Sequence, residues 1–301
     1  MPRWPLVLLI AAASAISGGS PSAARPSTDT PPTAEELHER AKALIANQHA
    51  NDAAIEQYER FERQMDRAAG MNPRVLDDKE YRVVPTGFGN YKILVQQDGK
   101  DVAPAEYRRQ LQKWAEALQI SMNPSDPRAR DLQAKFDKRM HDRAELIDAM
   151  QEAFTPKWLG RETKNGRFCD VLELVPNPQY HPRSLLQEAL THVTVKIWVD
   201  HASNQLVRGE ASVTRDISVG GGIFGKLYRG GVFAMDQQEF APGVWLPVRL
   251  QYDYTIRKFL FTSEEHQLME ATRYKRLGTP KDAFAVVQAE LAKTPHQDSD
   301  P

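Results

Sequence analysis

Two stretches in the second half of the chain alternate between apolar and polar residues. A period of two predicts β-strands with one apolar and one solvated face. We expect Trp198 and Trp245 on the opposite, more polar face. The apolar positions of the two stretches, with two phenylalanines that extend the second, are Val193, Val195, Ile197, Val199, Val244, Leu246, Val248, Leu250, Tyr252, Tyr254, Phe259 and Phe261. Such a face must be covered by a second sheet, by helices or by an apolar ligand.

Further strands are expected throughout residues 167–277, with others near residues 81–85 and 91–100. Amphipathic helices are predicted to begin near Thr33, Pro104 and Ser125, and a last one spans residues 283–292. Thr33 and Glu36 have the spacing of a capping box. Residues 53–66 suit either a helix or a strand by their pattern. The sequence therefore predicts an antiparallel sheet of nine to eleven strands, with helices available to line one face.

The helix expected over residues 125–154 has an apolar stripe with many flexible side chains. Methionine and phenylalanine repack around irregular partners more easily than β-branched residues do. The opposite side of the helix is strongly charged, so this helix is either a movable lid or a permanent part of the core. The candidate lid residues are Phe136, Met140, Met150 and Phe154.

The first 24 residues have the layout of a secretory signal peptide. Arg3 precedes an apolar run at residues 6–16, and a stretch of small residues follows up to Ala24. The apolar run is short for a membrane span. We therefore expect export with cleavage near Ala24 and no stable membrane span. Residues 25–33 form a predicted disordered linker, and residues 281–301 a predicted C-terminal helix and disordered tail.

Composition argues against several kinds of chemistry. The net charge of −1 gives no basic surface for nucleic acid. Cys169 is the single cysteine of the chain, so no intramolecular disulfide forms, and its strand-like surroundings predict a small buried side chain. The eight histidines show no metal-ligand spacing. We find no catalytic triad order, and we expect no metal, no cofactor and no enzymatic activity.

A glycine run resembles two nucleotide-binding patterns. Gly220, Gly222 and Gly225 satisfy G-x-G-x-x-G, and Lys226 extends the run toward a phosphate loop. Both motifs require a helix directly after the glycines. The residues that follow are strand-like, and Leu227 stands where a phosphate loop has serine or threonine. A flexible turn or a bend in the sheet is the expected structure.

Several segments together resemble outer-membrane lipoprotein-sorting proteins of the LolA/LolB type. Trp198, Asp200 and Arg208 match a hairpin motif of that superfamily, and residues 243–247 match its G-x-W-L-P phrase. The N-terminal part resembles long, uncharacterised members, in which residues 53–66 would form a strand. The resemblance extends over about residues 34–277.

The resemblance implies an α+β fold in which a curved antiparallel sheet forms an incomplete β-barrel and helices cover its concave face. It places this half-barrel at residues 34–280, with a helical insert near residues 104–154. It also implies a hydrophobic cavity that binds acyl chains of lipid or lipoprotein in the periplasm. The apolar positions given above are the candidate cavity residues. The alternative is an envelope-stress sensor or interaction module of the same fold, with an envelope protein as partner and no lipid ligand.

Overall fold

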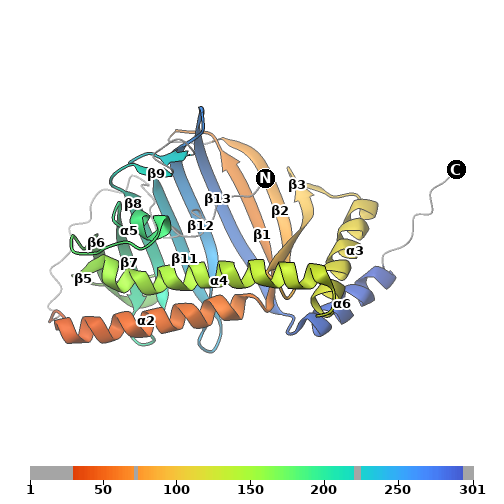
Figure 1. Cartoon of the computed structure of the whole chain (residues 1–301), viewed down its shortest axis with the longest axis horizontal. Coiled ribbons are helices and arrows are strands. Elements are labelled where there is room, and N and C mark those ends of the chain that lie inside the picture. Colours follow the sequence, from red (N-terminus) through yellow and green to blue (C-terminus); the bar gives the residue numbers. More distant parts are fainter. Residues whose placement is uncertain (1–29, 71–73, 220–224, 294–301) are drawn as a thin grey trace. The chain divides into compact units, whose positions relative to one another are not determined.

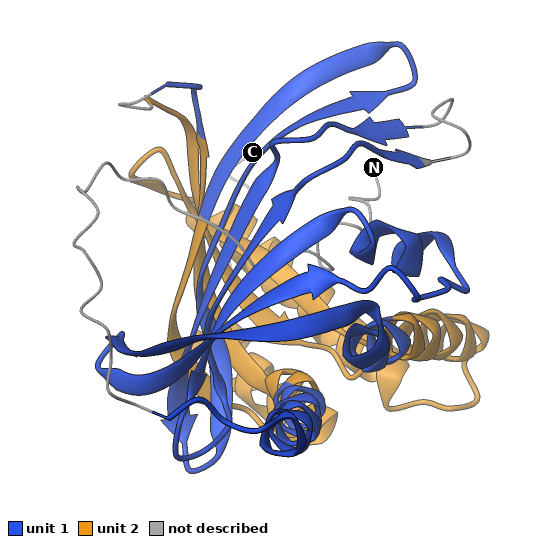
Figure 2. Ribbon diagram, turned by 90° about the vertical axis from the view of Figure 1, so that its left-hand side faces the viewer, with its two compact units in different colours: residues 1–51, 67–73, 143–268 blue, residues 52–66, 74–142, 269–301 orange. Residues whose placement is uncertain are grey.

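The computed structural model describes residues 30–70, 74–219 and 225–293. The predicted signal peptide and most of the predicted linker lie outside these residues. The chain divides into two compact units (Figure 2). Unit 1 comprises residues 1–51, 67–73 and 143–268, and unit 2 comprises residues 52–66, 74–142 and 269–301. Helices α2 and α4 and strand β13 each contribute residues to both units.

The secondary structure mixes helices with a large set of strands (Figure 1). The helices are α2 (Ala34–Ile55), α3 (Pro104–Ser121), α4 (Pro127–Ala153), α5 (Leu185–Leu190) and α6 (Pro280–Lys293). The first strands are β1 (Tyr58–Arg67), β2 (Val75–Pro85), β3 (Asn90–Gln97), β4 (Lys100–Asp101), β5 (Phe154–Lys164) and β6 (Arg167–Pro176). The remaining strands are β7 (Val193–Asp200), β8 (Leu206–Val213), β9 (Ile217–Val219), β10 (Gly225–Leu227), β11 (Val232–Ala241), β12 (Val244–Lys258) and β13 (Phe261–Arg276).

The described strands pair antiparallel in a sheet that does not close. Within unit 1 the order is β13-β12-β11-β8-β7-β6-β5, and β10 pairs with both β12 and β9. Within unit 2 the order is β4-β3-β2-β1-β13. Figure 2 shows the strands of unit 1 as a curved sheet. The predicted α+β fold with an open antiparallel sheet is confirmed.

Local signals in the sequence set several of the helix and strand boundaries. The Thr33 hydroxyl accepts from the Glu36 amide at 3.2 Å, and the Glu36 carboxylate accepts from the Thr33 amide at 2.7 Å. This reciprocal pair is the predicted capping box. Helix α2 then continues to Ile55, and β1 begins at Tyr58. The ambiguous segment 53–66 therefore holds the end of a helix and most of a strand.

Strand β5 is absent from the sequence prediction. It pairs with β6 along its whole length, but a register shift lies between Trp158 and Gly160. Pro156, Gly160 and the bulge interrupt the alternation that marks a strand. Residues 226–240 read as one continuous strand in the sequence, but the structure divides them, because the chain turns at Gly230, where φ is 87°, between β10 and β11.

The core of unit 2 lies between its strands and helices α3 and α6. Val84, Ile93, Trp114 and Leu118 are fully buried there, and the Trp114 indole nitrogen donates to the Pro85 carbonyl at 2.9 Å. This core contains none of the predicted cavity residues. Across the described parts of the chain, no helix combines the length and hydrophobicity needed to cross a bilayer.

Candidate functional site

The candidate site is the side of the unit 1 sheet that carries the large buried cluster, and we call this side the apolar face. The predicted cavity residues of β7 all contribute to it, since Val193, Val195, Ile197 and Val199 are buried in one cluster. Leu172 on β6 and Ala211 on β8 lie on either side, opposite Ile197 and Val195 respectively. Residues paired directly across strands share a face of the sheet. The alternation in the sequence therefore placed these four valine and isoleucine side chains on the correct face.

Three helices cover part of this face. Helix α5 contributes Ala189 and Leu190 to the buried cluster, and the unit 1 part of α4 contributes Leu146, Ala149 and Ala153. Leu37 and Leu44 of α2 pack against the cluster and are partly exposed. Side chains of the protein itself therefore fill the part of the face formed by β6, β7 and β8.

The apolar face continues onto β11 and β12, where it is less covered. Tyr252 lies opposite Phe233, and Leu250 lies opposite Met235, so both belong to the same face. Phe233 and Met235 are buried, whereas Tyr252 and Leu250 are partly exposed. Tyr254 stacks on Phe233 with a ring-centroid distance of 5.5 Å. This section of the sheet offers apolar and aromatic surface that water still reaches.

Strand β13 gives the same face a polar border. The Tyr254 hydroxyl donates to the Glu265 carboxylate at 2.8 Å, and the Tyr252 hydroxyl donates to the Gln267 side-chain oxygen. The tyrosine rings thus add apolar area while their hydroxyls are satisfied at the border. Hydrogen bonds to Tyr254 and Lys258 help to hold the pKa of Glu265 below its ordinary value, although burial raises it.

The remaining β12 positions depart from a simple alternation. Leu246 is fully buried, and Val244 and Val248 are partly exposed. Register shifts between β11 and β12 lie at Asp236/Gln237 and at Glu239/Ala241. The first shift leaves Val248 of β12 without a paired residue on β11, so odd and even positions on either side of it no longer predict the same face of the sheet. Trp198 and Trp245 share a separate buried cluster with Cys169, Val171 and Val207, away from the apolar face.

Phe259 and Phe261 lie outside the cluster that they were expected to extend. Phe259 and Leu260 form the two-residue turn between β12 and β13, and Phe261 begins β13. The exposed fractions of Phe259 and Phe261 are 61% and 80%. The alternation of β12 ends where the chain reverses, which the spacing of apolar residues does not reveal.

The candidate lid residues do not form one helical stripe. Phe154 is the first residue of β5, because α4 ends at Ala153. Met150 packs against the apolar face, and Phe136 and Met140 are partly buried in the unit 2 part of α4. Arg139 of α4 lies over the Phe136 ring and donates to the Phe88 carbonyl at 3.1 Å. Phe154 therefore cannot move as part of a helical lid.

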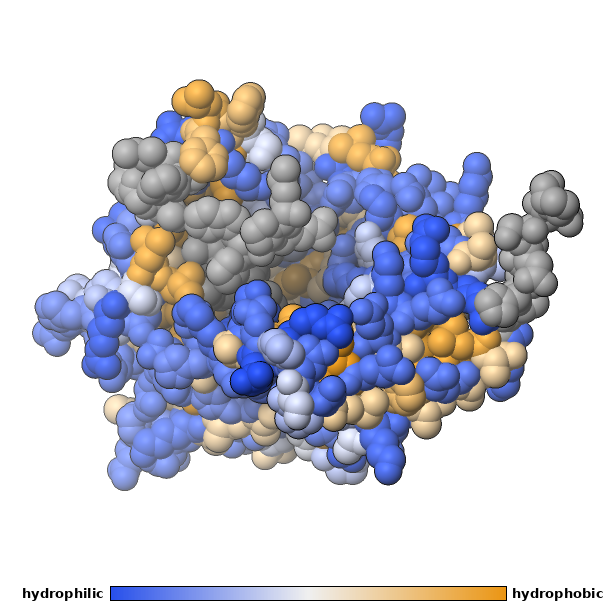
Figure 3. All heavy atoms as spheres, turned by 45° about the vertical axis from the view of Figure 1, so that its right-hand side comes forward, coloured by the Kyte–Doolittle hydropathy of each residue, from blue (hydrophilic) through white to orange (hydrophobic). Residues whose placement is uncertain are grey.

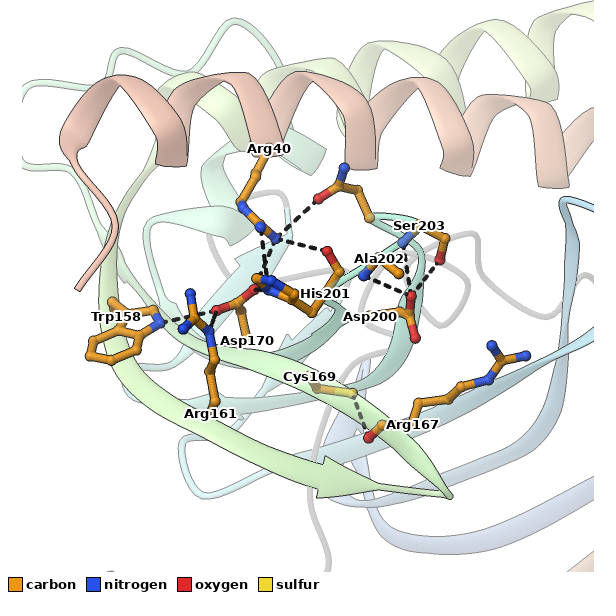
Figure 4. A network of polar contacts seen from close by, with 11 residues as sticks. Arg40, Trp158, Arg161, Arg167, Cys169, Asp170, Asp200, His201, Ala202 and Ser203 are labelled. Carbon is orange, nitrogen blue, oxygen red and sulfur yellow. Dashed lines mark hydrogen bonds and ion pairs between the residues drawn. The ribbon is translucent and has the colours of Figure 1, made fainter. Parts of the chain in front are cut away.

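A network of charged side chains lies at one end of the apolar face, centred on Asp170 (Figure 4). Asp170 lies opposite Val199, and its carboxylate accepts from Arg40 of α2 at 2.8 Å and from Arg161 of β5 at 2.8 Å. The His201 Nδ1 is 2.6 Å from the same carboxylate. Burial raises the pKa of Asp170, but the hydrogen bonds from His201 and Arg161 and the charge of Arg40 outweigh it and hold the pKa below its ordinary value. The network ties α2, β5 and β6 together.

An aspartate beside a histidine raises the question of catalysis. The nearby Ser203 hydroxyl donates to the Asp200 carboxylate at 2.8 Å, and Asp200 also accepts the backbone amide of Ser203. The His201 ring contacts Arg40, Asp170 and Phe168, and Ser203 is bound to Asp200 as part of a turn rather than held as a nucleophile. The geometry indicates a structural ion-pair cluster.

Cys169 is fully buried, and its thiol donates to the Arg167 carbonyl at 3.4 Å. Burial raises its pKa to about 11. Because the thiolate is the reactive form, this cysteine has little nucleophilic character at neutral pH. The prediction of a small buried side chain is confirmed.

The phosphate-loop pattern has no helix behind it in the described chain. Gly225, Lys226 and Leu227 form β10, and the Lys226 ammonium pairs with the Asp216 carboxylate at 2.7 Å. Gly220 and Gly222 lie outside the described residues. Within the described residues, no group of three or more histidine, cysteine, aspartate or glutamate side chains is arranged to hold a metal ion.

One surface depression of unit 1 is polar. It has a volume of about 400 Å³ and lies beside α4 and the segment after β6. Its lining residues are Glu152, Asn177, Gln179, Tyr180, His181, Pro182 and Arg183. Charged and amide side chains dominate this lining, so the depression does not suit an acyl chain.

Two residues of the site were missed from the sequence. Ile256 packs against the apolar face and continues the series of Tyr252 and Tyr254. Gln237 is almost completely buried, and its amide nitrogen donates to Gln48 of α2 at 3.3 Å. Its side-chain oxygen has no hydrogen-bond partner in the described structure. Ile256 could have been identified, because it continues the alternation of Tyr252 and Tyr254 along β12. The position of Gln237 could not, because it depends on the bulge beside it.

Comparison with known proteins gives likeness of fold alone. No family model and no curated protein matches the chain. A solved domain from Vibrio parahaemolyticus, classed with outer membrane lipoprotein-sorting proteins, is similar with a TM-score of 0.32 and 11% identity, covering 82% of this chain and 99% of that one. A LolA superfamily protein from Nitrosomonas europaea is similar with a TM-score of 0.30 and 15% identity, covering 81% and 96%. The Pseudomonas aeruginosa MucA/MucB complex gives a TM-score of 0.22 and 8% identity, covering 80% and 99%.

Proposed function

We propose that this chain is an exported envelope protein whose apolar face binds an acyl chain of a lipid or lipoprotein, in the manner of a carrier. The observation that carries the proposal is the partly exposed section of the face at Leu250, Tyr252 and Ile256. Buried neighbours from β11 and the border on β13 flank this section. An acyl chain bound there would remove both its own apolar surface and that of the protein from water.

The energetics favour such a ligand without any catalytic group. Burial of an acyl chain contributes about 0.8 kcal/mol for each methylene. A dozen buried methylenes would then supply on the order of 10 kcal/mol before the costs of ordering the chain and the protein. The hydroxyls of Tyr252 and Tyr254 face polar partners on β13, so a ligand need not satisfy them.

A second function is favoured by a different observation. Leu146, Ala149, Ala153, Ala189 and Leu190 already fill the apolar face over β6 to β8. A face closed by its own helices needs no ligand for stability. The same fold would then act as an interaction module or envelope-stress sensor with a protein partner.

Titration with a fluorescent fatty acid separates the two functions. The carrier function predicts saturable binding, with an increase in fluorescence as the probe enters an apolar environment, and displacement by an unlabelled fatty acid. Binding that never saturates, or that unlabelled fatty acid does not displace, would leave the interaction module as the better account.

A further inference from the structure

The turn between β12 and β13 exposes consecutive large apolar side chains. The exposed fractions are 61% for Phe259, 91% for Leu260 and 80% for Phe261. Figure 1 shows this hairpin ending on the side of the unit 1 sheet away from α2. In Figure 3, which is turned about the vertical axis, hydrophobic residues lie at the same upper edge. Three such residues in a row at a hairpin tip are unusual for a surface in contact with water only.

The conformation of the turn strengthens this observation. Phe259 has φ of 54°, a left-handed conformation that bulky residues rarely adopt. Other two-residue turns of this chain use residues suited to it, at Asp98–Gly99 and Asn165–Gly166. A phenylalanine in this position carries backbone strain that a glycine, asparagine or aspartate would largely avoid. The turn therefore carries apolar side chains despite a local conformational cost.

The apolar segment is sharply limited on both sides. Lys258 precedes it, and its ammonium pairs with the Glu265 carboxylate at 2.7 Å. Thr262 and Ser263 follow it and are exposed. A convex tip of this kind fits no flat protein surface, since a protein partner would need a matching pocket. The interfacial region of a bilayer accepts apolar and aromatic side chains without such a shape requirement.

We propose that the Phe259–Leu260–Phe261 tip inserts into a lipid bilayer surface and docks unit 1 on the membrane. The polar residues on either side would stay at the level of the lipid headgroups. This docking needs no lipid on the apolar face, so it is independent of the proposed function. It would bring a carrier, or equally a sensor, to the membrane without a spanning segment.

Flotation with vesicles of phosphatidylethanolamine and phosphatidylglycerol tests the docking. Burial of one leucine or phenylalanine side chain contributes about 1.5–3 kcal/mol, so Leu260→Asn or Phe261→Asn should each weaken vesicle binding by about tenfold or more. Leu132→Asn is the matched control, because it removes an exposed leucine from α4. The control should bind like the unaltered protein. Equal binding of all variants, or an equal loss in the control, would overturn the proposal.

A label at the tip provides a second readout. An environment-sensitive fluorophore on Leu260→Cys should shift to shorter wavelength when these vesicles are added, whereas the same label on Lys100→Cys, beside the polar β3–β4 turn, should not. Buried Cys169, with its raised pKa, will not compete for the label. An unchanged spectrum at residue 260 would refute insertion. Self-association without lipid that Leu260→Asn abolishes would instead assign the tip to a second copy of the chain.

Discussion

Replacing Asp170 by asparagine is expected to lower the free energy of unfolding by about 3 kcal/mol at pH 7, because it removes the anion from a largely buried ion-pair cluster. The Asp170 side chain is only 4% exposed. Arg40, Arg161 and His201 would all face an uncharged amide, which has a single acceptor oxygen. The estimate is at the lower end for a buried pair, since Arg40 and Arg161 are 25% and 20% exposed and can regain some hydration. Urea unfolding measures this difference directly.

Asp148→Asn is the matched control for this substitution. Asp148 lies on α4 and its carboxylate is 2.7 Å from His49 Nε2 of α2, but its side chain is 63% exposed. An exposed ion pair contributes at most about 1 kcal/mol. If Asp170→Asn destabilises the protein no more than Asp148→Asn does, the network of Figure 4 is not the anchor that joins α2, β5 and β6.

The loss of stability caused by Asp170→Asn should depend on pH in a defined direction. The pKa of Asp170 lies below its ordinary value of 3.8, because hydrogen bonds and charge outweigh the effect of burial. A carboxylate with a lowered pKa in the folded state contributes stability that is complete well above 3.8 and is lost as the pH falls through its folded pKa. The difference in unfolding free energy between the unaltered protein and Asp170→Asn should therefore shrink below about pH 4. A difference that stays constant into strong acid would contradict the assignment.

Replacing Leu250 by aspartate is expected to weaken binding of a fluorescent fatty acid by about tenfold or more. A carboxylate on the apolar face would have to lose water when an acyl chain covers it, and the leucine contact with the ligand, about 1.5–3 kcal/mol, would be lost. Leu250 is partly exposed in the free protein, so the folded sheet tolerates the change better than it would at a buried position.

Arg249→Asp provides the control on the neighbouring residue. Arg249 is exposed and lies opposite Asp236, on the face away from Leu250. The substitution makes the chain more negative, as Leu250→Asp does, but should leave fatty acid binding nearly unchanged. Similar weakening in both variants would show that charge alone acts on the probe and would remove Leu250 from the site.

Residue spacing was sufficient to predict the parts of the fold that contain no bulge and no chain reversal. Val193 to Val199 alternate without interruption, and all four apolar side chains lie on the apolar face. The Thr33–Glu36 capping box likewise depends only on residues three apart. Alternation failed at β5 and within β12, where bulges change the face, and at Phe259, where the chain turns.

The Asp170 network could not be predicted from spacing. It joins Arg40, Arg161 and His201, which come from three separate segments of the chain. One signal was nevertheless present in the sequence. Asp170 has the same parity as Leu172 and Leu174, so a carboxylate was placed on a face that is otherwise apolar. Such a group must have charged partners, although the sequence does not reveal which ones.

The most direct test of the proposed function is native mass spectrometry of the protein purified from bacterial envelope without added lipid. A carrier should be recovered partly with a mass increment of a lipid or a lipidated protein, and Leu250→Asp should reduce that occupancy while Arg249→Asp should not. Recovery of the unaltered protein with no bound acyl species, together with a crosslinked envelope protein, would contradict the carrier function.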